Sequence, residues 1–326
     1  MKHHYAKRAA AFSLASALLL SGSASALFGK KAPAEAPAGA PMARDLEINT
    51  YRGIPYSAQL LASDSEGDDI TFAIAREPKK GTVEIDGANF VYTPKENAVG
   101  GDRFTYTATD SSGKTSLPAT VTVTIEKTRS GVTYADMEDS AAAAAAQCLA
   151  EEGIFTGVCI GGQYYFQPET EVSRNEFLAM TMEMAEREVT TVTVTGFCDD
   201  ESIPVWAKSY VSAGVAQGIV QGKSTEDGPV FRGGEAITFS EAATVLDRVL
   251  GLEDVDLQVW YADREAVPSW AAQAVGNMEA VSVLPAASFG SLDLDKAVTR
   301  ADAARMLSAA KTLLEGEKND SLSRVK

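Results

Sequence analysis

The feature that most constrains the fold of this chain is a pattern that occurs three times in its C-terminal two-thirds. Each copy has an aromatic-x-Asp opening, a first apolar helix and a second helix entered through Ser/Thr-x-x-Glu/Asp. The openings are Tyr134-Ala135-Asp136, Phe197-Cys198-Asp199 and Tyr261-Ala262-Asp263. Their spacing of about 64 residues exceeds that of the common two-helix repeats, so each unit must carry substantial loops. The pattern predicts an assembly module rather than a catalytic site.

The second helix of each unit is predicted by a capping box, in which a hydroxyl residue is followed three positions later by a carboxylate. The helix starts are Ser173-Arg174-Asn175-Glu176, Thr238-Phe239-Ser240-Glu241 and Thr299-Arg300-Ala301-Asp302. Behind them, apolar residues recur at helical spacing. These stripes are Phe177, Met180 and Met184; Ala242, Val245, Leu246 and Val249; and Ala303, Met306, Leu307 and Ala310. The three stripes can share one core.

The N-terminus has the pattern of a secretory signal peptide over residues 1–26. Three basic residues precede an apolar run from Ala9 to Leu20, and Ala24-Ser25-Ala26 supplies a small-x-small cleavage site. The apolar run is shorter than the roughly 20 residues that a membrane span needs. The sequence therefore predicts a secreted protein with no transmembrane segment after cleavage.

Cleavage would also change the chemistry open to the mature chain. The formal charge of −16 becomes −19, because Lys2, Lys7 and Arg8 are removed, and both histidines, His3 and His4, are lost. A chain without histidine cannot use Ser-His or Cys-His catalysis or a His-ligated zinc site. Its acidity argues against nucleic-acid binding, although an anionic ligand could still occupy a local cationic pocket.

The chain has an odd number of cysteines, so at most one internal disulfide forms. Cys148 and Cys159 flank the first glycine turn and could pair. The alternative is that these two and Cys198 are all small, buried apolar residues.

Residues 27–43 are rich in Pro and Ala and predict a semi-extended linker. From 44 to 127 the apolar period changes to two, which indicates half-buried strands. Strands are expected at 46–50, 56–61, 70–74, 81–85, 90–93, 104–108 and 119–125. Seven strands within about 80 residues predict an all-β sandwich.

Three segments of this region, ASDSEGDDITFAI, GTVEIDGANFVYTP and GGDRFTYTATDSSG, resemble the bacterial Ig-like, cadherin-like domains of surface proteins. The resemblance implies a calcium site in the acidic loops, since carboxylate oxygens are the ligands that Ca²⁺ prefers. The candidate ligands are Asp64, Glu66, Asp68, Asp102 and Asp110, with Asp69 beside them. The alternative is that these residues only shape turns and that the protein has no cofactor.

The triplicated part resembles the S-layer homology (SLH) family. Its first unit has Tyr134 to Asp136, Gly153-Ile154, Phe166-Gln167-Pro168 and Ser173 to Glu176, which match that family's aromatic-x-Asp start, Gly-Ile turn, aromatic-x-Pro segment and Thr-Arg-Ala-Glu-like helix start. The resemblance implies a mainly α, pseudo-threefold bundle of three SLH repeats at 131–190, 195–252 and 258–315. Residues 316–326 are expected to form a disordered tail.

The SLH resemblance further implies that grooves between repeats bind a cell-wall glycan, such as a secondary wall polysaccharide carrying pyruvate ketals. A guanidinium suits the ketal carboxylate, and a tryptophan face suits a sugar ring. The candidate glycan-binding residues are Arg174, Trp206, Arg300, Trp270, Gly157 and Gly222. Chain order pairs Arg174 with Trp206 and Phe239 with Trp270, leaving Arg300 without a tryptophan, so the Arg174 groove is expected to bind most strongly.

The units also depart from the family pattern. Phe239 replaces the arginine of unit two, Ala141 or a neighbour replaces the tryptophan of unit one, and Ser282, Val283 and Ala286 replace the glycine turn of unit three. The alternative role for both tryptophans is to fill the core, and for the arginines to be solvated. Asp136, Asp199 and Asp263 are expected to cap the first helices.

The functional expectation is a non-catalytic cell-envelope protein, held on wall polysaccharide or a peptidoglycan-linked glycan and displaying its Ig-like domain to a protein partner. One alternative is a structural lattice protein that assembles on the wall. Another is a wall-glycan hydrolase with paired carboxylates, a chemistry that needs no histidine.

Overall fold

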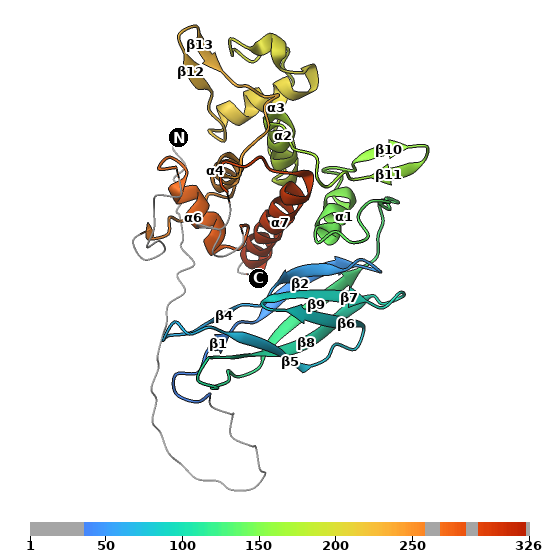
Figure 1. The fold of residues 1–326 in the computed structure, drawn as a ribbon. Helices are drawn as coiled ribbons and strands as arrows, with labels where there is room; N and C mark the ends of the chain where they lie inside the picture. The colour runs from blue at the N-terminus through green and yellow to red at the C-terminus, as the bar shows by residue number, and fades with distance from the viewer. Residues whose placement is uncertain (1–35, 258–267, 285–292, 324–326) are drawn as a thin grey trace.

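The computed structural model describes residues 36–257, 268–284 and 293–323, which form a β-sandwich and a helical region packed beside it (Figure 1). The predicted signal peptide, the third opening Tyr261 to Asp263 and Ala286 lie outside the described residues.

The sandwich consists of a four-stranded and a three-stranded sheet. The first has the order β2-β9-β8-β5 and the second β3-β7-β6, and the β2–β9 pair is the one parallel pairing among the described strands. Their bounds are β2 Leu46–Tyr51, β3 Tyr56–Gln59, β5 Thr71–Arg76, β6 Gly81–Asp86, β7 Asn89–Pro94, β8 Gly100–Thr109 and β9 Ala119–Glu126. Alternate residues meet between the sheets, with Phe90, Tyr92, Phe104 and Tyr106 at 0–1 % exposure. The seven strands expected from the two-residue period are all present.

A short extra ribbon extends the sandwich into the predicted linker. β1 (Met42–Ala43) pairs with β4 (Ala62–Ser63), so the sandwich begins before residue 44. The buried Tyr106 hydroxyl lies 2.6 Å from the carbonyl oxygen of Arg44 and 2.7 Å from that of Leu61. This bridge holds the two segments together, which the Pro/Ala composition of the linker did not reveal.

The helical region repeats a helix, a loop or hairpin, and a second helix. Unit one contains α1 (Ala143–Glu151), β10 (Val158–Ile160), β11 (Gln163–Tyr165) and α2 (Arg174–Met184). Unit two contains η1 (Asp200–Ser202), α3 (Val205–Ala216), β12 (Lys223–Thr225), β13 (Gly228–Val230) and α4 (Phe239–Leu250). Unit three contains α6 (Ala272–Ala280) and α7 (Arg300–Ser323). The buried stripes of α2, α4 and α7 lie in one common hydrophobic core, as their spacing predicted.

All three second helices begin with the expected capping box. The hydroxyl oxygens of Ser173, Thr238 and Thr299 accept from the amides three residues later at 3.3, 3.3 and 3.2 Å. The carboxylates of Glu176, Glu241 and Asp302 accept in return from the cap amides at 2.8, 3.2 and 3.2 Å. Hydroxyl and carboxylate together satisfy two otherwise unpaired donors at each start.

The first helices end in equivalent turns with a left-handed residue. Gly153 has φ +69°, Gly218 +73° and Ser282 +60°. The following amides close the turn by donating to carbonyl oxygens five residues back, Ile154 to Leu149 at 2.9 Å, Ile219 to Gly214 at 2.8 Å and Val283 to Met278 at 2.9 Å. Unit three therefore keeps the turn without its glycine, and Ser282 bears the steric cost of that conformation.

A cycle of backbone hydrogen bonds joins the three units. The Val172 amide donates to the Val298 carbonyl at 2.9 Å, Val298 to Ile237 at 2.8 Å, and Ile237 to Val172 at 2.9 Å. Each of these residues directly precedes the N-cap of a second helix. Because the cycle closes through one residue of each unit, α2, α4 and α7 start from one shared centre.

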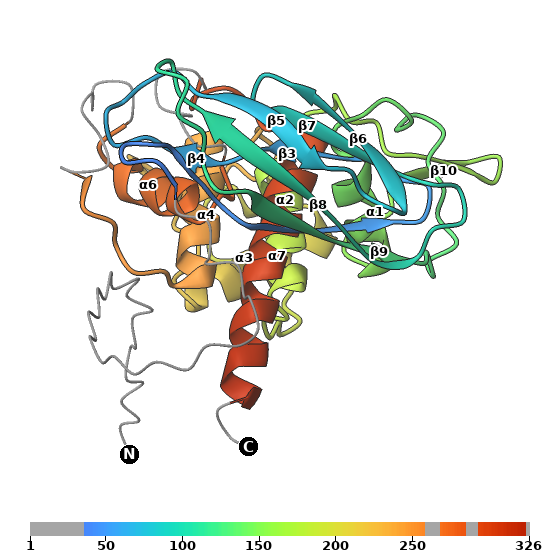
Figure 2. The same ribbon diagram turned by 90° about the horizontal axis from the view of Figure 1, so that it is seen from below.

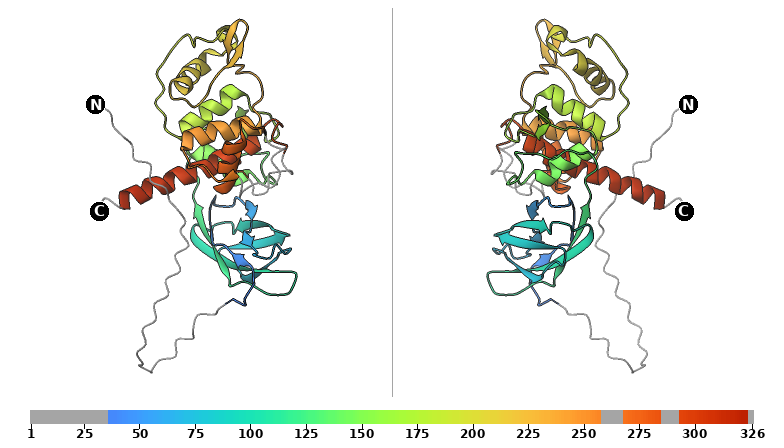
Figure 3. Two further views of the ribbon diagram at one scale, coloured as in Figure 1. Left: turned by 90° about the vertical axis from the view of Figure 1, so that its left-hand side faces the viewer. Right: turned by 90° about the vertical axis from the view of Figure 1, so that its right-hand side faces the viewer.

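The C-terminal segment differs from the expectation of disorder after residue 315. Helix α7 continues to Ser323, and its last turns extend beyond the other helices (Figures 2 and 3). Leu, Glu and Lys between 313 and 318 favour helix, and the preceding turns of α7 supply the nucleus that helix growth needs.

The sandwich meets the helical region along β2. Tyr51, at the end of β2, lies beside the Cys148 thiol of α1, and Ile54 packs against the helical core. Burial raises the pKa of Cys148. All three cysteines lie among the described residues and form no disulfide there. Cys148 is half-buried, whereas Cys159 and Cys198 are exposed, so the alternative of three buried cysteines holds only in part, for Cys148.

Candidate functional site

Each second helix starts against a turn of a neighbouring unit, and we call these three contacts junctions. In the Arg174 junction, the amides of Arg174 and Asn175 donate to unit two. In the Phe239 junction, those of Phe239 and Ser240 donate to unit three, and in the Arg300 junction those of Arg300 and Ala301 donate to unit one. The acceptors are the carbonyl oxygens of Glu235 and Gly233, Lys296 and Leu294, and Thr170 and Pro168, at 2.8–3.2 Å. These helix starts are therefore not free to bind an anion through their amides.

Two of the accepting turns are held by the aspartates of the aromatic-x-Asp openings. Asp136 accepts from the Phe166 and Gln167 amides at 2.9 and 2.7 Å. Asp199 accepts from the Phe231 and Arg232 amides at 2.8 and 2.7 Å. The expectation that these aspartates cap the first helices is wrong: each clamps a turn about 30 residues later, at a residue with positive φ. Asp263 lies outside the described residues.

The Arg174 guanidinium is tightly bound within the protein. Its Nη1 lies 2.6 Å from Oε1 of Glu241, the capping carboxylate of unit two. Its Nε donates to the Phe231 carbonyl at 3.2 Å, and its Cζ lies 5.3 Å from the centre of the Phe231 ring. With 17 % of its side chain exposed, Arg174 has most of its charge compensated by the protein itself.

The Arg300 guanidinium is held by neutral groups. Its Nη1 donates to the Phe166 carbonyl at 3.2 Å and to Oε1 of Gln167 at 2.8 Å. Its Cζ lies 5.2 Å from the centre of the Phe155 ring, which packs edge-on against Phe166. No carboxylate of the described residues forms an ion pair with Arg300. This guanidinium is therefore fixed in place by neutral groups, with no ion-pair partner among the described residues.

The Phe239 junction has no cation at the equivalent position. Phe239 is 5 % exposed and belongs to the shared core. The three junctions thus share their backbone bonds but carry an ion-paired arginine, an unpaired arginine and a phenylalanine.

Both predicted tryptophans lie on the surface. Trp206, at the start of α3, is 52 % exposed, and Trp270, just before α6, is 60 % exposed. Neither fills the core. Trp206 belongs to the unit that Arg174 contacts and Trp270 to the unit that Phe239 contacts, but no ring contact among the described residues joins either tryptophan to an arginine.

The two predicted glycines are explained by close packing. A Cβ at Gly157 would lie 2.3 Å from the Tyr165 carbonyl oxygen, and one at Gly222 would lie 2.3 Å from the Phe197 ring. Gly157 also has φ +71°. Gly157 lets β10 begin directly against Tyr165 of β11. Gly222 lets β12 begin directly against Phe197 of the aromatic opening of its unit.

The residues predicted to bind calcium do not gather in one place. Asp102 starts the long strand β8, whereas Asp110 follows its end. Asp102 accepts from the Lys79 amide at 3.0 Å, the Lys80 amide at 2.7 Å and the Tyr92 hydroxyl at 2.9 Å. Burial acts to raise the pKa of Asp102, but these hydrogen bonds outweigh it and leave the pKa lowered. Asp102 is therefore a turn clamp.

Three of the other four, Asp64, Glu66 and Asp110, lie near Lys114, while Asp68 accepts from the Ser111 hydroxyl at 2.9 Å. Lys114 lies 3.2 Å from Glu66, and this hydrogen bond, with Asp110 and Asp64 nearby, raises the pKa of Lys114. Oδ2 of Asp64 and of Asp110 are buried without a partner among the described residues, but an ammonium already stands where a cation would be attracted. No three acidic, Cys or His side chains of the described residues converge as a metal group. The predicted set does not fit a calcium ion as one site.

Comparisons with known families match two parts of the chain. The bacterial Ig domain family matches residues 38–125 and the S-layer homology domain family matches residues 197–243. The chain therefore contains a bacterial Ig domain and an SLH domain. A search of curated proteins finds no match.

Two similar solved structures each match less than a third of the chain. An endo-fucoidan hydrolase of glycoside hydrolase family 107 is 21% identical over 26% of this chain and 13% of its own, with a TM-score of 0.23. The sialic acid binding region of a Streptococcus sanguinis adhesin is 20% identical over 29% and 31%, with a TM-score of 0.21. The chain spans less than a fifth of the hydrolase, and scores this low carry no functional argument.

In the part of the chain that the structure describes, no helix is both long and apolar enough to cross a membrane.

The partners that decide whether each arginine is ion-paired could not be recognised in the sequence. Glu241 was recognised only as a capping residue, although its second oxygen reaches Arg174 across the unit boundary. Phe155 and Gln167 at Arg300 were not candidates. A capping box carries no signal of which unit its carboxylate faces, so these contacts require the closed cycle of units to be known.

Proposed function

We propose that the chain carries three SLH repeats arranged with pseudo-threefold symmetry, of which the matched segment 197–243 is the second. The support is geometric: units one and three have the capping box, the left-handed turn and the inter-unit backbone bonds of unit two. Three independent segments would have no reason to close one cycle through equivalent residues.

The proposed function is non-covalent anchoring of a non-catalytic protein to an anionic glycan of the bacterial cell wall, with display of the Ig domain. The observation that carries it is the Arg300 guanidinium, which Phe155, Phe166 and Gln167 fix in place and which has no carboxylate partner in the part of the chain that the structure describes. In a chain of net charge −16, such a cation favours a local anion. A carboxylate-bearing sugar, such as a pyruvylated secondary wall polymer, suits its planar fork.

The exposed Trp206 and Trp270 support a sugar ligand, because an exposed aromatic face can pack against the apolar face of a sugar ring. The geometry changes the ranking expected from sequence. Arg174 must exchange Glu241 for a ligand, whereas Arg300 has no ion pair with any described residue to break, so the Arg300 junction is proposed as the principal anion site.

The test is binding of the mature protein to purified wall sacculi before and after removal of their attached polysaccharide. We expect binding to the intact sacculi and loss after extraction, with free polysaccharide competing. Equal binding to extracted sacculi would overturn the glycan assignment.

The same preparations, incubated with protein and assayed for released reducing ends, should show no hydrolysis above a buffer control. Turnover that a point substitution abolishes would overturn the non-catalytic proposal.

A further inference from the structure

The two outer edges of the four-stranded sheet differ in what lies beside them. β2 lies next to the helical region, whereas β5 is at the opposite edge, turned away from the helices (Figure 1). Residues 70–75 carry no charge and no proline. An open edge of this kind presents unpaired backbone donors and acceptors, which makes it a template for pairing with another strand.

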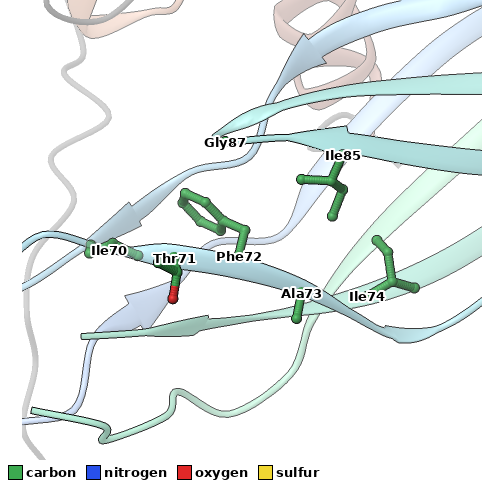
Figure 4. Close-up of a pocket in the computed structure, with 7 residues that line it drawn as sticks. All are labelled: Ile70, Thr71, Phe72, Ala73, Ile74, Ile85 and Gly87. Atoms are coloured by element: carbon green, nitrogen blue, oxygen red, sulfur yellow. The ribbon is translucent and has the colours of Figure 1, made fainter. Parts of the chain in front are cut away.

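An apolar groove runs beside this edge. A hollow of about 370 Å³ lies between β5 and the end of β6, lined by Ile70, Thr71, Phe72, Ala73, Ile74, Ile85 and Gly87 (Figure 4). Phe72 and Ile74 alternate inward and are half-buried, and the Phe72 ring lies 6.0 Å from that of Tyr106. The two sheets are not joined here, so these apolar side chains remain partly in water.

The charges flanking β5 are arranged with opposite signs. Asp68 and Asp69 precede the strand, while Arg76 ends it and Lys79 follows, with Glu77 as the one acidic residue at that end. Asp69 and Arg76 are both exposed. Two copies of β5 paired antiparallel would place the acidic end of each beside the basic end of the other, whereas parallel pairing would put like charges together.

We infer that the β5 edge is a self-association site, at which a second copy of this chain pairs antiparallel with β5 about a twofold axis. Phe72 and Ile74 of the second copy extend the inner face of the sheet and cover the groove. Because a twofold contact uses the same patch on both partners, it closes as a dimer. The inference goes beyond anchoring and involves none of the residues proposed to bind the wall.

The test is sedimentation of the whole mature protein across the micromolar range. We expect a concentration-dependent monomer–dimer equilibrium. Asp69→Lys and Arg76→Glu should each weaken the dimer about tenfold, since each reverses two symmetry-related contacts, and the double variant should restore it. If both single variants lose the dimer and the double variant does not recover it, the antiparallel pairing is overturned.

A second pair of variants tests the edge itself. Ala73→Lys places a charge in the middle of the paired edge and should abolish the dimer. Val91→Lys puts the same charge on the exposed face of the central strand β7 and should leave it unchanged. A protein that is monomeric at every concentration, or a dimer insensitive to Ala73→Lys, would overturn the inference. Wall binding in the sacculus assay should persist in all these variants, which separates this result from the anchoring test.

Discussion

The Arg174 and Arg300 junctions have the same backbone but different electrostatics. In each, the first two amides of a second helix donate to a neighbouring turn, and a guanidinium lies about 5 Å from a phenylalanine ring. Arg174 is ion-paired with Glu241, whereas Arg300 bonds a carbonyl and an amide oxygen and no carboxylate among the described residues. The same repeated motif can therefore preserve assembly in both junctions while leaving the two arginines in different electrostatic settings.

The largest expected effect is on Arg300. Arg300→Ala should weaken wall binding by about one to two orders of magnitude, because a hydrogen bond to an ionised group contributes roughly 1.5–3 kcal/mol. Arg174→Ala should cost less, since its charge is already compensated. Calorimetric titration of a defined anionic wall fragment, with circular dichroism to confirm folding, measures both.

The matched control is Arg305→Ala, which removes the same charge from an exposed position on the same helix. It should bind like the wild type. Arg300→Lys should fall between wild type and Arg300→Ala, because lysine keeps the charge but loses the planar fork. A larger loss in Arg174→Ala than in Arg300→Ala would reverse the assignment of the two junctions.

The backbone turns that support the junctions can be destabilised without changing either arginine. Asp136→Asn and Asp199→Asn each replace one accepting oxygen with an amide group facing a backbone donor, so each should lower the free energy of unfolding by about 1–3 kcal/mol. The two costs should be similar because the clamps are equivalent. Chemical denaturation measures the two changes in the free energy of unfolding. If only one of the two substitutions lowers it, the turns are not equivalent.

The elements of the fold were predictable because their causes are local. The two-residue alternation of Phe104 to Ala108 determines which face of a single strand is buried. The capping box of Ser173 to Glu176 determines where a single helix begins. The role of Asp136 was not predictable, since it depends on a turn about 30 residues away. The continuation of α7 past residue 315 was not predicted, and it follows from the preceding turns of the helix, which supply the nucleus for further growth.

The candidate site was predictable only in part. Family resemblance selected Arg174 and Arg300, but chain order could not show that Glu241 compensates one of them. Gly157 and Gly222 stay predictions as ligand contacts, and the structure adds a packing reason for each, an atom 2.3 Å from where a Cβ would lie. Such contacts between distant segments have no periodic signature in the sequence.

A smaller effect should come from releasing Arg174. Glu241→Gln keeps the cap, because glutamine also serves in a capping box, but removes the ion pair. The freed guanidinium should raise affinity for the anionic fragment a few-fold, on the scale of about 0.5–1 kcal/mol for a partly exposed pair. Glu176→Gln is the control, since it changes the equivalent cap without touching an arginine. Unchanged affinity in Glu241→Gln would mean that the ion pair does not limit the Arg174 junction.

The smallest expected effect concerns the one unit that lacks its turn glycine. Ser282 has φ +60° where the other units have Gly153 and Gly218. A glycine at position 282 would remove the steric cost of the left-handed conformation, which is about 1–2 kcal/mol. The greater conformational entropy of glycine in the unfolded chain would offset about 0.5–1 kcal/mol of this gain. Ser282→Gly should therefore stabilise the protein by roughly 0.5 kcal/mol, raising Tm by about 1–2 °C. Gly153→Ser and Gly218→Ser should lower Tm by a similar amount, because they install the same strain in units one and two. Scanning calorimetry of the three variants compares the units directly, and a Tm that falls in Ser282→Gly would show that the serine side chain stabilises unit three by more than its backbone strain costs.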